Sequence, residues 1–206
     1  MYCARKGYIK TIELLLKHGA KLDAQDDNGN TPLHHAVSRS SFDTVKLLLD
    51  NKTNTEIKNN LQLTPLLLGV TRGDINIVKL LLNNKADVNA QTDRGHTALM
   101  LAIMNNNHET VIPMMKLLIE YGADVNACAN DGSTAIMTVV INIEDRNFVD
   151  DVFDLLVQHG ADLGVTEDEI ISHIKTMFGK DEDVSRNFEK AMRKLFINKK
   201  GLVSDV

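Results

Sequence analysis

The sequence has little of the composition that marks several classes of protein. Only two of its 206 residues are cysteines, Cys3 and Cys128, and no CxxC spacing occurs, so neither a disulfide framework nor a zinc site is expected. Tryptophan is absent and aromatic residues make up 4% of the chain, which leaves few side chains on which nucleic-acid bases can stack. No apolar run approaches the roughly 20 residues that span a bilayer.

An excess of positive charge is missing as well. The formal net charge is −5, so the chain lacks a basic field for phosphate backbones, and nucleic acid is not an expected partner. The beginning of the sequence carries Arg5, Lys6 and Lys10 where a signal peptide needs its apolar core. These features favour a reducing location, the cytoplasm or the nucleus, and no membrane association.

Motifs of common enzymes do not occur either. The sequence has no G-x-x-x-x-G-K-[ST] loop, no G-x-G-x-x-G and no G-x-S-x-G. Its seven histidines are scattered, and none pairs with another at metal-ligand spacing near a carboxylate or thiol. Cys128 has no positioned base nearby in sequence. We therefore expect a protein that is not an enzyme and that uses neither a cofactor nor a metal.

What the sequence does contain is an internal repeat. Threonine followed by Pro or Ala and then by Leu or Ile recurs at intervals of 33, 33 and 37 residues, at Thr31, Thr64, Thr97 and Thr134. Runs of three leucines move in step with it, at residues 14–16, 47–49 and 80–82. A fixed period of this length is typical of a stack of small units that bury their apolar faces against each other.

Each unit has the signals of two helices. Thr31 caps a helix whose first residue, Pro32, lacks an amide hydrogen that would have no partner at that position. A second helix is predicted for the stretch "FDTVKLLLD", in which Val45, Leu48 and Leu49 have helical spacing. A left-handed residue should end this second helix in every unit.

Glycine occupies this left-handed position in three units, and lysine occupies it in two. The glycines are Gly19, Gly122 and Gly160, and the lysines are Lys52 and Lys85. A left-handed conformation costs a residue with a side chain on the order of 1 kcal/mol. The two junctions with lysine are therefore predicted to be the softer ones.

These motifs resemble the ankyrin repeat, with its T-P-L-H-x-A start, V-x-L-L-L outer helix and G-A-D-V-N-A exit. The resemblance extends from residue 1 to about residue 164. It implies an all-α fold, an α-solenoid in which helix-turn-helix units with short β-hairpin tips are stacked, and it implies that His34 hydrogen-bonds across adjacent hairpins. By alignment the units are residues 1–26, a partial first repeat, then 27–59, 60–92, 93–129 and 130–164, the last two with insertions.

Both ends of the array depart from the repeat. The first unit lacks its hairpin and its helix start, which favours a fragment of a longer protein over a truncated cap. The extra residues of the last two units are expected in loops between the paired helices. Residues 165–206 predict amphipathic helices that cap the stack. The basic side of the last helix is also typical of a calmodulin target or a membrane-surface helix.

In ankyrin folds the hairpin tips and the first helix of each unit line a concave groove, and that surface usually binds the partner. The second tip is unusual because Gln62 replaces the glycine of the other tips and leucines flank it. On this basis the predicted partner-binding residues are Leu61, Leu63, Leu68, Arg72, Arg94, His96, Leu101, Met104 and Ile141. The alternative is that neighbouring side chains or a preceding segment cover the aliphatic residues of this set.

The resemblance implies a non-enzymatic module that binds a peptide or helix of another protein and is monomeric on its own. An alternative is a host-targeting domain of a larger viral or intracellular-bacterial effector; its only support is a composition rich in Asn, Ile and Lys, as in AT-rich genomes. Asn89 and Asn126 match a family position that can be β-hydroxylated in animal cells. Hydrogen bonding of the turn before the hairpin is the favoured role for both.

Overall fold

The structure is a computed structural model, and it describes residues 1–105, 107–142 and 146–162. The helices in these residues are, in chain order, α1 (Tyr2–Lys6), α2 (Ile9–Lys17), α3 (Pro32–Ser38), α4 (Phe42–Asp50), α5 (Pro65–Arg72), α6 (Ile75–Asn83), α7 (Ala98–Met104), α8 (His108–Glu120), α9 (Ala135–Asn142) and α10 (Arg146–Gln158). The predicted C-terminal cap, residues 165–206, lies outside the described residues.

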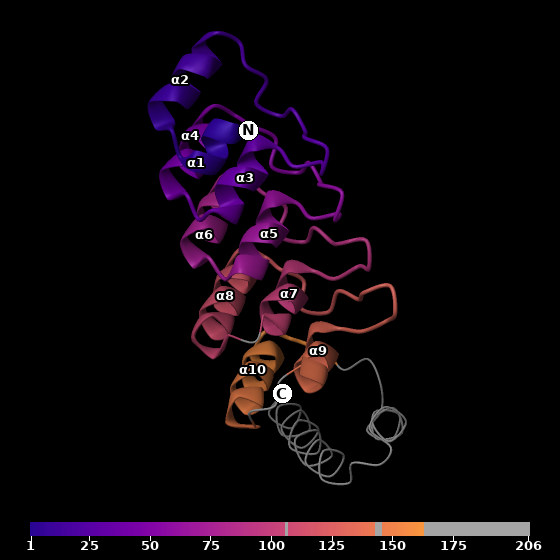
Figure 1. The fold of residues 1–206 in the computed structure, drawn as a ribbon. Coiled ribbons are helices and arrows are strands. Elements are labelled where there is room, and N and C mark those ends of the chain that lie inside the picture. Colours follow the sequence, from indigo (N-terminus) through magenta and orange to yellow (C-terminus); the bar gives the residue numbers. More distant parts are fainter. Residues whose placement is uncertain (106, 143–145, 163–206) are drawn as a thin grey trace.

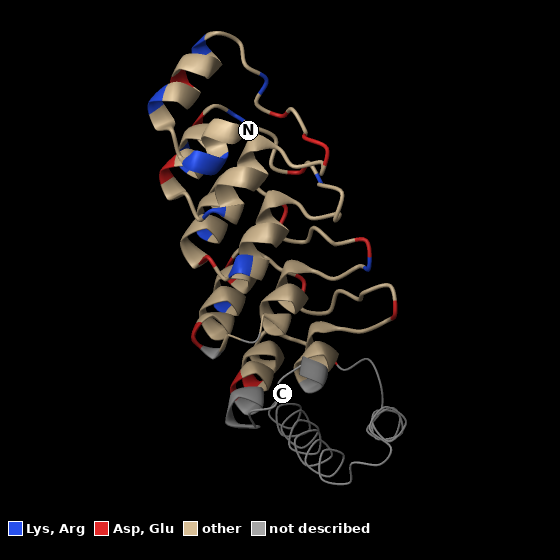
Figure 2. Cartoon of the chain, in the orientation of Figure 1, with Lys and Arg blue, Asp and Glu red and all other residues tan. Residues whose placement is uncertain are grey.

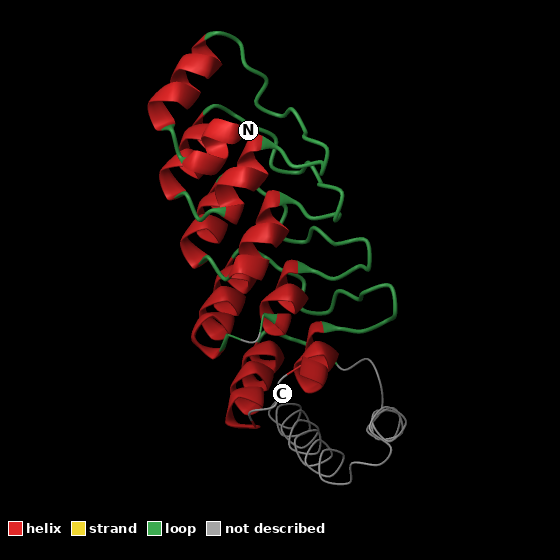
Figure 3. Cartoon of the chain, in the orientation of Figure 1, coloured by secondary structure: helices red, strands yellow, loops and turns green. Residues whose placement is uncertain are grey.

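The helices form two parallel rows (Figure 1). The inner row consists of α1, α3, α5, α7 and α9, and the outer row of α2, α4, α6, α8 and α10. Each helix contacts its neighbours in the same row, and the two helices of each pair contact each other. The long loops that join successive pairs all project to one side of the stack (Figure 3). The predicted all-helical repeat stack is therefore confirmed.

The inner helices begin where the sequence predicts. The side chains of Thr31, Thr64 and Thr97 accept hydrogen bonds from the N–H groups three residues further on, which satisfies a donor that has no partner within the helix. Pro32 and Pro65 occupy the first helical position. The start of each unit is thus set by local sequence.

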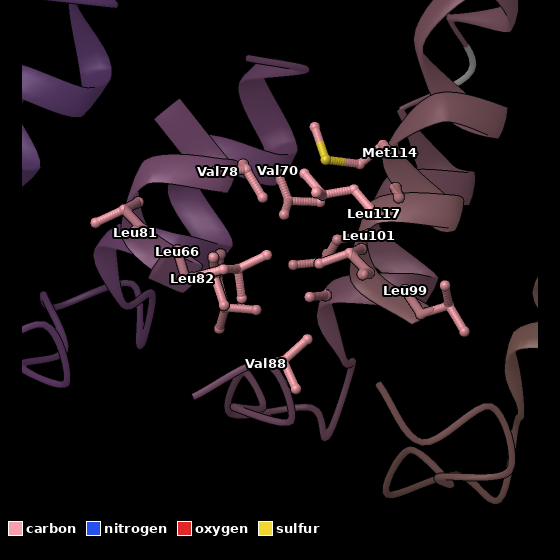
Figure 4. Packing of buried hydrophobic residues seen from close by; sticks show 14 of the residues in the cluster. Leu66, Val70, Val78, Leu81, Leu82, Val88, Leu99, Leu101, Met114 and Leu117 are labelled. Atoms are coloured by element: carbon pink, nitrogen blue, oxygen red, sulfur yellow. The ribbon is translucent and has the colours of Figure 1, made fainter. Parts of the chain in front are cut away.

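A single apolar core runs along the stack. Leu66 and Leu67 are at most 1% exposed and belong to this core. Figure 4 shows part of this core, in which Leu66, Leu81 and Leu99 come from α5, α6 and α7. Burial of one such side chain contributes about 1.5–3 kcal/mol. Because the core is shared between units, no unit can bury its apolar face alone.

The extra residues of the last two units do not lie where the sequence analysis placed them. The outer helices α8 and α10 are 13 residues long, whereas α4 and α6 are 9 residues long. The insertions therefore extend the outer helices, and the prediction that they lie in loops is wrong. Since about 3.6 residues make one helical turn, a four-residue insertion adds one turn and keeps the apolar face in register.

The predicted left-handed positions are confirmed. Gly19 and Gly122 have φ angles of 79° and 86°, and Lys52 and Lys85 have φ angles of 65° and 66°. The connecting loops are less regular than the predicted β-hairpins. In the described part of the chain they contain one isolated antiparallel bridge, between Gln91 and Thr97, and no longer ladder.

Candidate partner-binding surface

The structure separates the predicted binding residues into exposed, half-buried and buried groups. Leu61 is 73% exposed at the tip of the second hairpin, and Met104 is 41% exposed at the end of α7. Arg72 and Arg94 are also exposed. The half-buried residues are Leu63, Leu68 and His96. Ile141 belongs to α9, but its side chain lies outside the described part.

The structure places Leu101 in the core, whereas the sequence analysis placed it on the binding surface. It is only 8% exposed, and Figure 4 shows it among the side chains of the core cluster. Helix α7 packs against α5, α8 and α9, and its sequence "ALMLAIM" is apolar on every side, so its pattern does not reveal which residues its neighbours cover. Thr138, the equivalent residue one unit later, is likewise buried. The exposed apolar surface is therefore smaller than predicted, with Leu61 and Met104 as its most exposed members.

The tip that carries Leu61 is held by Asn59. The side-chain oxygen of Asn59 accepts hydrogen bonds from the N–H groups of Leu61 (3.0 Å) and Leu63 (3.1 Å). Its side-chain nitrogen donates to Oδ1 of Asn30 in the preceding hairpin (2.9 Å). Gln62, with φ at 58°, completes the turn in the left-handed conformation. Leu61 thus extends into solvent from an ordered turn.

Successive hairpin tips are joined by an asparagine that packs on a glycine. The N–H of Asn60 donates to the carbonyl of Asn28 (3.0 Å), and its side-chain nitrogen donates to the carbonyl of Asp27 (2.9 Å). Gly29 leaves room for this contact, because a Cβ at its position would lie 2.5 Å from the side-chain oxygen of Asn60. The same arrangement joins the third and fourth tips through Asn130 and Gly95.

This link is absent between the second and third tips. At the equivalent positions Gln62 stands where the glycine is expected and Asp93 where the asparagine is expected, and an aspartate side chain has no N–H to donate. No hydrogen bond joins residues 59–63 to residues 92–96 in the described chain. The carbonyl of Leu61 and the N–H of Asp93 therefore make no hydrogen bond within the described residues. The sequence analysis found Gln62 but missed Asp93, which the same comparison between units reveals.

His34 joins the first two hairpins from inside the stack. Its ring nitrogen Nδ1 accepts a hydrogen bond from the N–H of Thr31 (3.2 Å), so Nε2 carries the proton and donates to the carbonyl of Leu63 (3.0 Å). This confirms the cross-hairpin bond that the resemblance implied. Burial lowers the pKa of His34 below its ordinary value, and the bond to Leu63 opposes this only in part.

The lowered pKa of His34 predicts a pH-dependent stability. As pH falls below about 6.5, the unfolded chain takes up the proton more readily than the folded chain, so the free energy of unfolding decreases. Leucine fits this position, since Leu67 and Met100 occupy it in the next two units. We expect urea unfolding at pH 7.5 and 5.5 to show a smaller loss of stability for His34→Leu than for the wild type. An equal loss in both proteins would contradict this role.

Charged groups on the described surface are largely unpaired. Lys, Arg, Asp and Glu are interspersed along the hairpins and outer helices (Figure 2). The one ion pair in the described residues joins Nε2 of His35 to Oδ2 of Asp26, 2.8 Å apart. Burial raises the pKa of Asp26, but bonds from Asn30, His35 and Asn28 outweigh this effect and keep the pKa below its ordinary value. Neither Arg72 nor Arg94 is paired with a carboxylate in the described residues.

Asn89 and Asn126 join the turns of successive units. The side chain of Asn89 donates to the carbonyl of Gly122 (3.2 Å) and accepts from the N–H of Asp124 (2.8 Å). Asn126 repeats the first of these bonds one unit later, to the carbonyl of Gly160 (3.0 Å). The structural role predicted for both residues is confirmed.

The described part of the chain lacks the marks of other classes of site. In residues 1–105, 107–142 and 146–162, no group of three or more His, Cys, Asp or Glu side chains is arranged to hold a metal ion. No helix in the same residues is long and apolar enough to cross a bilayer. Both cysteines are free thiols.

Comparison with known proteins agrees with this geometry. A family profile described as ankyrin repeats (3 copies) matches residues 1–92 and residues 66–167. The matched segments overlap and together contain every described helix. No match was found among curated proteins.

Proposed function

Because the chain belongs to the ankyrin repeat family, a fold of non-catalytic protein-interaction modules, we propose that it binds a segment of another protein on the hairpins and inner helices of residues 60–129. The apolar anchors in this proposal are Leu61 and Met104, with Leu63 and Leu68 contributing their exposed edges. The observation that carries it is the 73% exposure of Leu61 on an ordered turn.

An aliphatic side chain on a rigid tip suits recognition. The turn is fixed by Asn59 before binding, so little conformational entropy is lost when Leu61 is covered. Complete burial of a leucine contributes about 1.5–3 kcal/mol. The free carbonyl of Leu61 and the free N–H of Asp93 offer hydrogen bonds to the main chain of the partner, in the manner of an extended peptide that pairs with exposed backbone.

The flanking charges add a preference for acidic residues. Arg72 at the end of α5 and Arg94 at the third tip are exposed, and neither is paired with a carboxylate of the described chain. Charge complementarity of this kind mainly improves specificity and the rate of association. The proposed partner segment therefore combines aliphatic and acidic side chains. Leu101 is excluded as an anchor because it is buried in the core.

We also propose that the array acts as a monomer in the cytoplasm or the nucleus, where its two free thiols stay reduced. A role as the host-targeting part of a larger viral or bacterial effector stays a prediction from the sequence alone. Identification of the bound partner distinguishes a general scaffold from such a targeting domain, since a targeting domain has one principal host protein.

Affinity capture from a cell lysate, followed by mass spectrometry and titration of the captured protein, tests the proposal. We expect Leu61→Ser with Met104→Ser to weaken binding of the captured protein by about tenfold or more, which corresponds to about 1.4 kcal/mol. The melting temperature should change little, because both side chains are largely outside the core.

A matched control is available on the outer row. Phe42 is 44% exposed on α4, so Phe42→Ser removes a comparable apolar side chain from a different surface and is expected to leave binding unchanged. The proposal is wrong if the double variant binds as tightly as the wild type, or if Phe42→Ser weakens binding to the same extent.

A further inference from the structure

Helix α2 exposes a leucine that the other outer helices bury. Leu15 stands 33 residues before Leu48 and 66 before Leu81, so the three occupy the same position in successive units. Leu48 is 1% exposed and Leu81 is 0% exposed, whereas Leu15 is 46% exposed. Leu14 beside it is 57% exposed. Leucine thus occupies this position in all three units, but within the described residues no preceding helix packs over Leu15.

Other positions of the first helix pair are also more exposed than the equivalent positions of later pairs. Thr11 is exposed, although Thr44 and Ile77 at the equivalent positions are fully buried. Tyr2 and Tyr8 lie on this pair too, and both are exposed, with their rings in edge-to-face contact 6.4 Å apart. The first pair therefore presents an apolar face that includes Leu14 and Leu15.

This face is continuous with the stacking interface of the rest of the molecule. Each of α4, α6 and α8 contacts the outer helix of the preceding pair, and α2 stands at the end of that row with no described helix beyond it (Figure 1). A terminal repeat that ends a stack in water needs a polar outer face. The leucines at 14–16 instead match those at 47–49 and 80–82. A partner of unrelated shape does not require that match.

We propose that the face of α1 and α2 that contains Leu14 and Leu15 is a packing surface for a further helix pair of the same repeat type, which continues the stack beyond α1. That pair covers Leu15 in the same way that α2 covers Leu48 and α4 covers Leu81. Tyr2 and Tyr8 then lie at or beside the new junction.

The test uses the protein's own repeat as the added pair. Residues 27–59 followed by residues 27–33 are fused directly to the N-terminal side of Met1, because Met1 occupies the position of His34 and this extension restores the register. We expect the melting temperature of the extended chain to rise by at least about 5 °C. Amide exchange in α2, residues 9–17, should become slower in the extended chain than in the original.

A double comparison isolates the contact of Leu15. Leu15→Ala should lower the melting temperature by less than about 2 °C in the original chain and by about 6–10 °C in the extended chain, where the leucine is buried. As a control, Leu81→Ala should cause a similar large loss in both chains. The proposal is overturned if Leu15→Ala has the same effect in both chains or if exchange in α2 does not slow.

A second copy of the chain is the other occupant of this face that must be distinguished from a further helix pair. Analytical ultracentrifugation of the original chain over a wide concentration range separates the two cases. A monomer at all concentrations agrees with the proposal. A dimer that Leu14→Ser with Leu15→Ser dissociates would instead assign the face to self-association and overturn it.

Discussion

Replacement of Gly29 or Gly95 by alanine is expected to destabilise the array by about 3 kcal/mol. Both glycines have positive φ, 72° and 79°, where a side chain is strained. A Cβ on Gly29 would also lie 2.5 Å from Oδ1 and 2.8 Å from the main-chain nitrogen of Asn60. On Gly95 the equivalent distances to Asn130 are 2.6 Å and 2.7 Å. Urea unfolding of both variants measures the loss.

Gly132 separates the two causes of this loss. It has a φ of 81°, but no atom of the described residues lies within 4 Å of the position of its Cβ. Gly132→Ala should therefore show only the backbone cost, about 1 kcal/mol. If all three variants lose the same stability, the close contact between glycine and asparagine does not hold the tips together, and the link between hairpins has another origin.

The second large effect is a gain of stability at the junction where that link is missing. Gln62→Gly together with Asp93→Asn recreates the glycine and asparagine found at the other two junctions between tips. We expect the free energy of unfolding to rise by about 1–2 kcal/mol. The new asparagine side chain can donate to the carbonyl of Asn60, as Asn60 itself donates to that of Asp27. Urea unfolding of the double variant tests this.

The two changes should depend on each other. With Gln62 present, its Cβ occupies the space that the new asparagine needs, so Asp93→Asn alone should change stability by less than about 0.5 kcal/mol. Gln62→Gly alone should also have little effect, because relief of the left-handed strain is offset by the greater flexibility of glycine, about 0.5–1 kcal/mol. Gains that simply add would contradict a shared contact.

The candidate surface was predictable only in part. Comparison of the units identified Leu61 because Gln62 beside it replaces the glycine of the other tips, at a position that always lies in a tip. It failed for Leu101, because α7 is apolar on all sides and its neighbours decide which side is covered. The missing link between Gln62 and Asp93 was readable from the same comparison, but its meaning depends on the contact that Asn60 and Gly29 make in space.

The sequence by itself determined the features that depend on neighbouring residues in the chain. Threonine caps, Pro32 and Pro65 at helix starts, the 33-residue period and the left-handed residues after the outer helices all follow from local backbone chemistry. Only the tertiary structure decided which equivalent leucines are covered. Leu15 and Leu48 are the same residue at the same position, and they differ in exposure because, within the described residues, a preceding helix pair packs on Leu48 and none packs on Leu15.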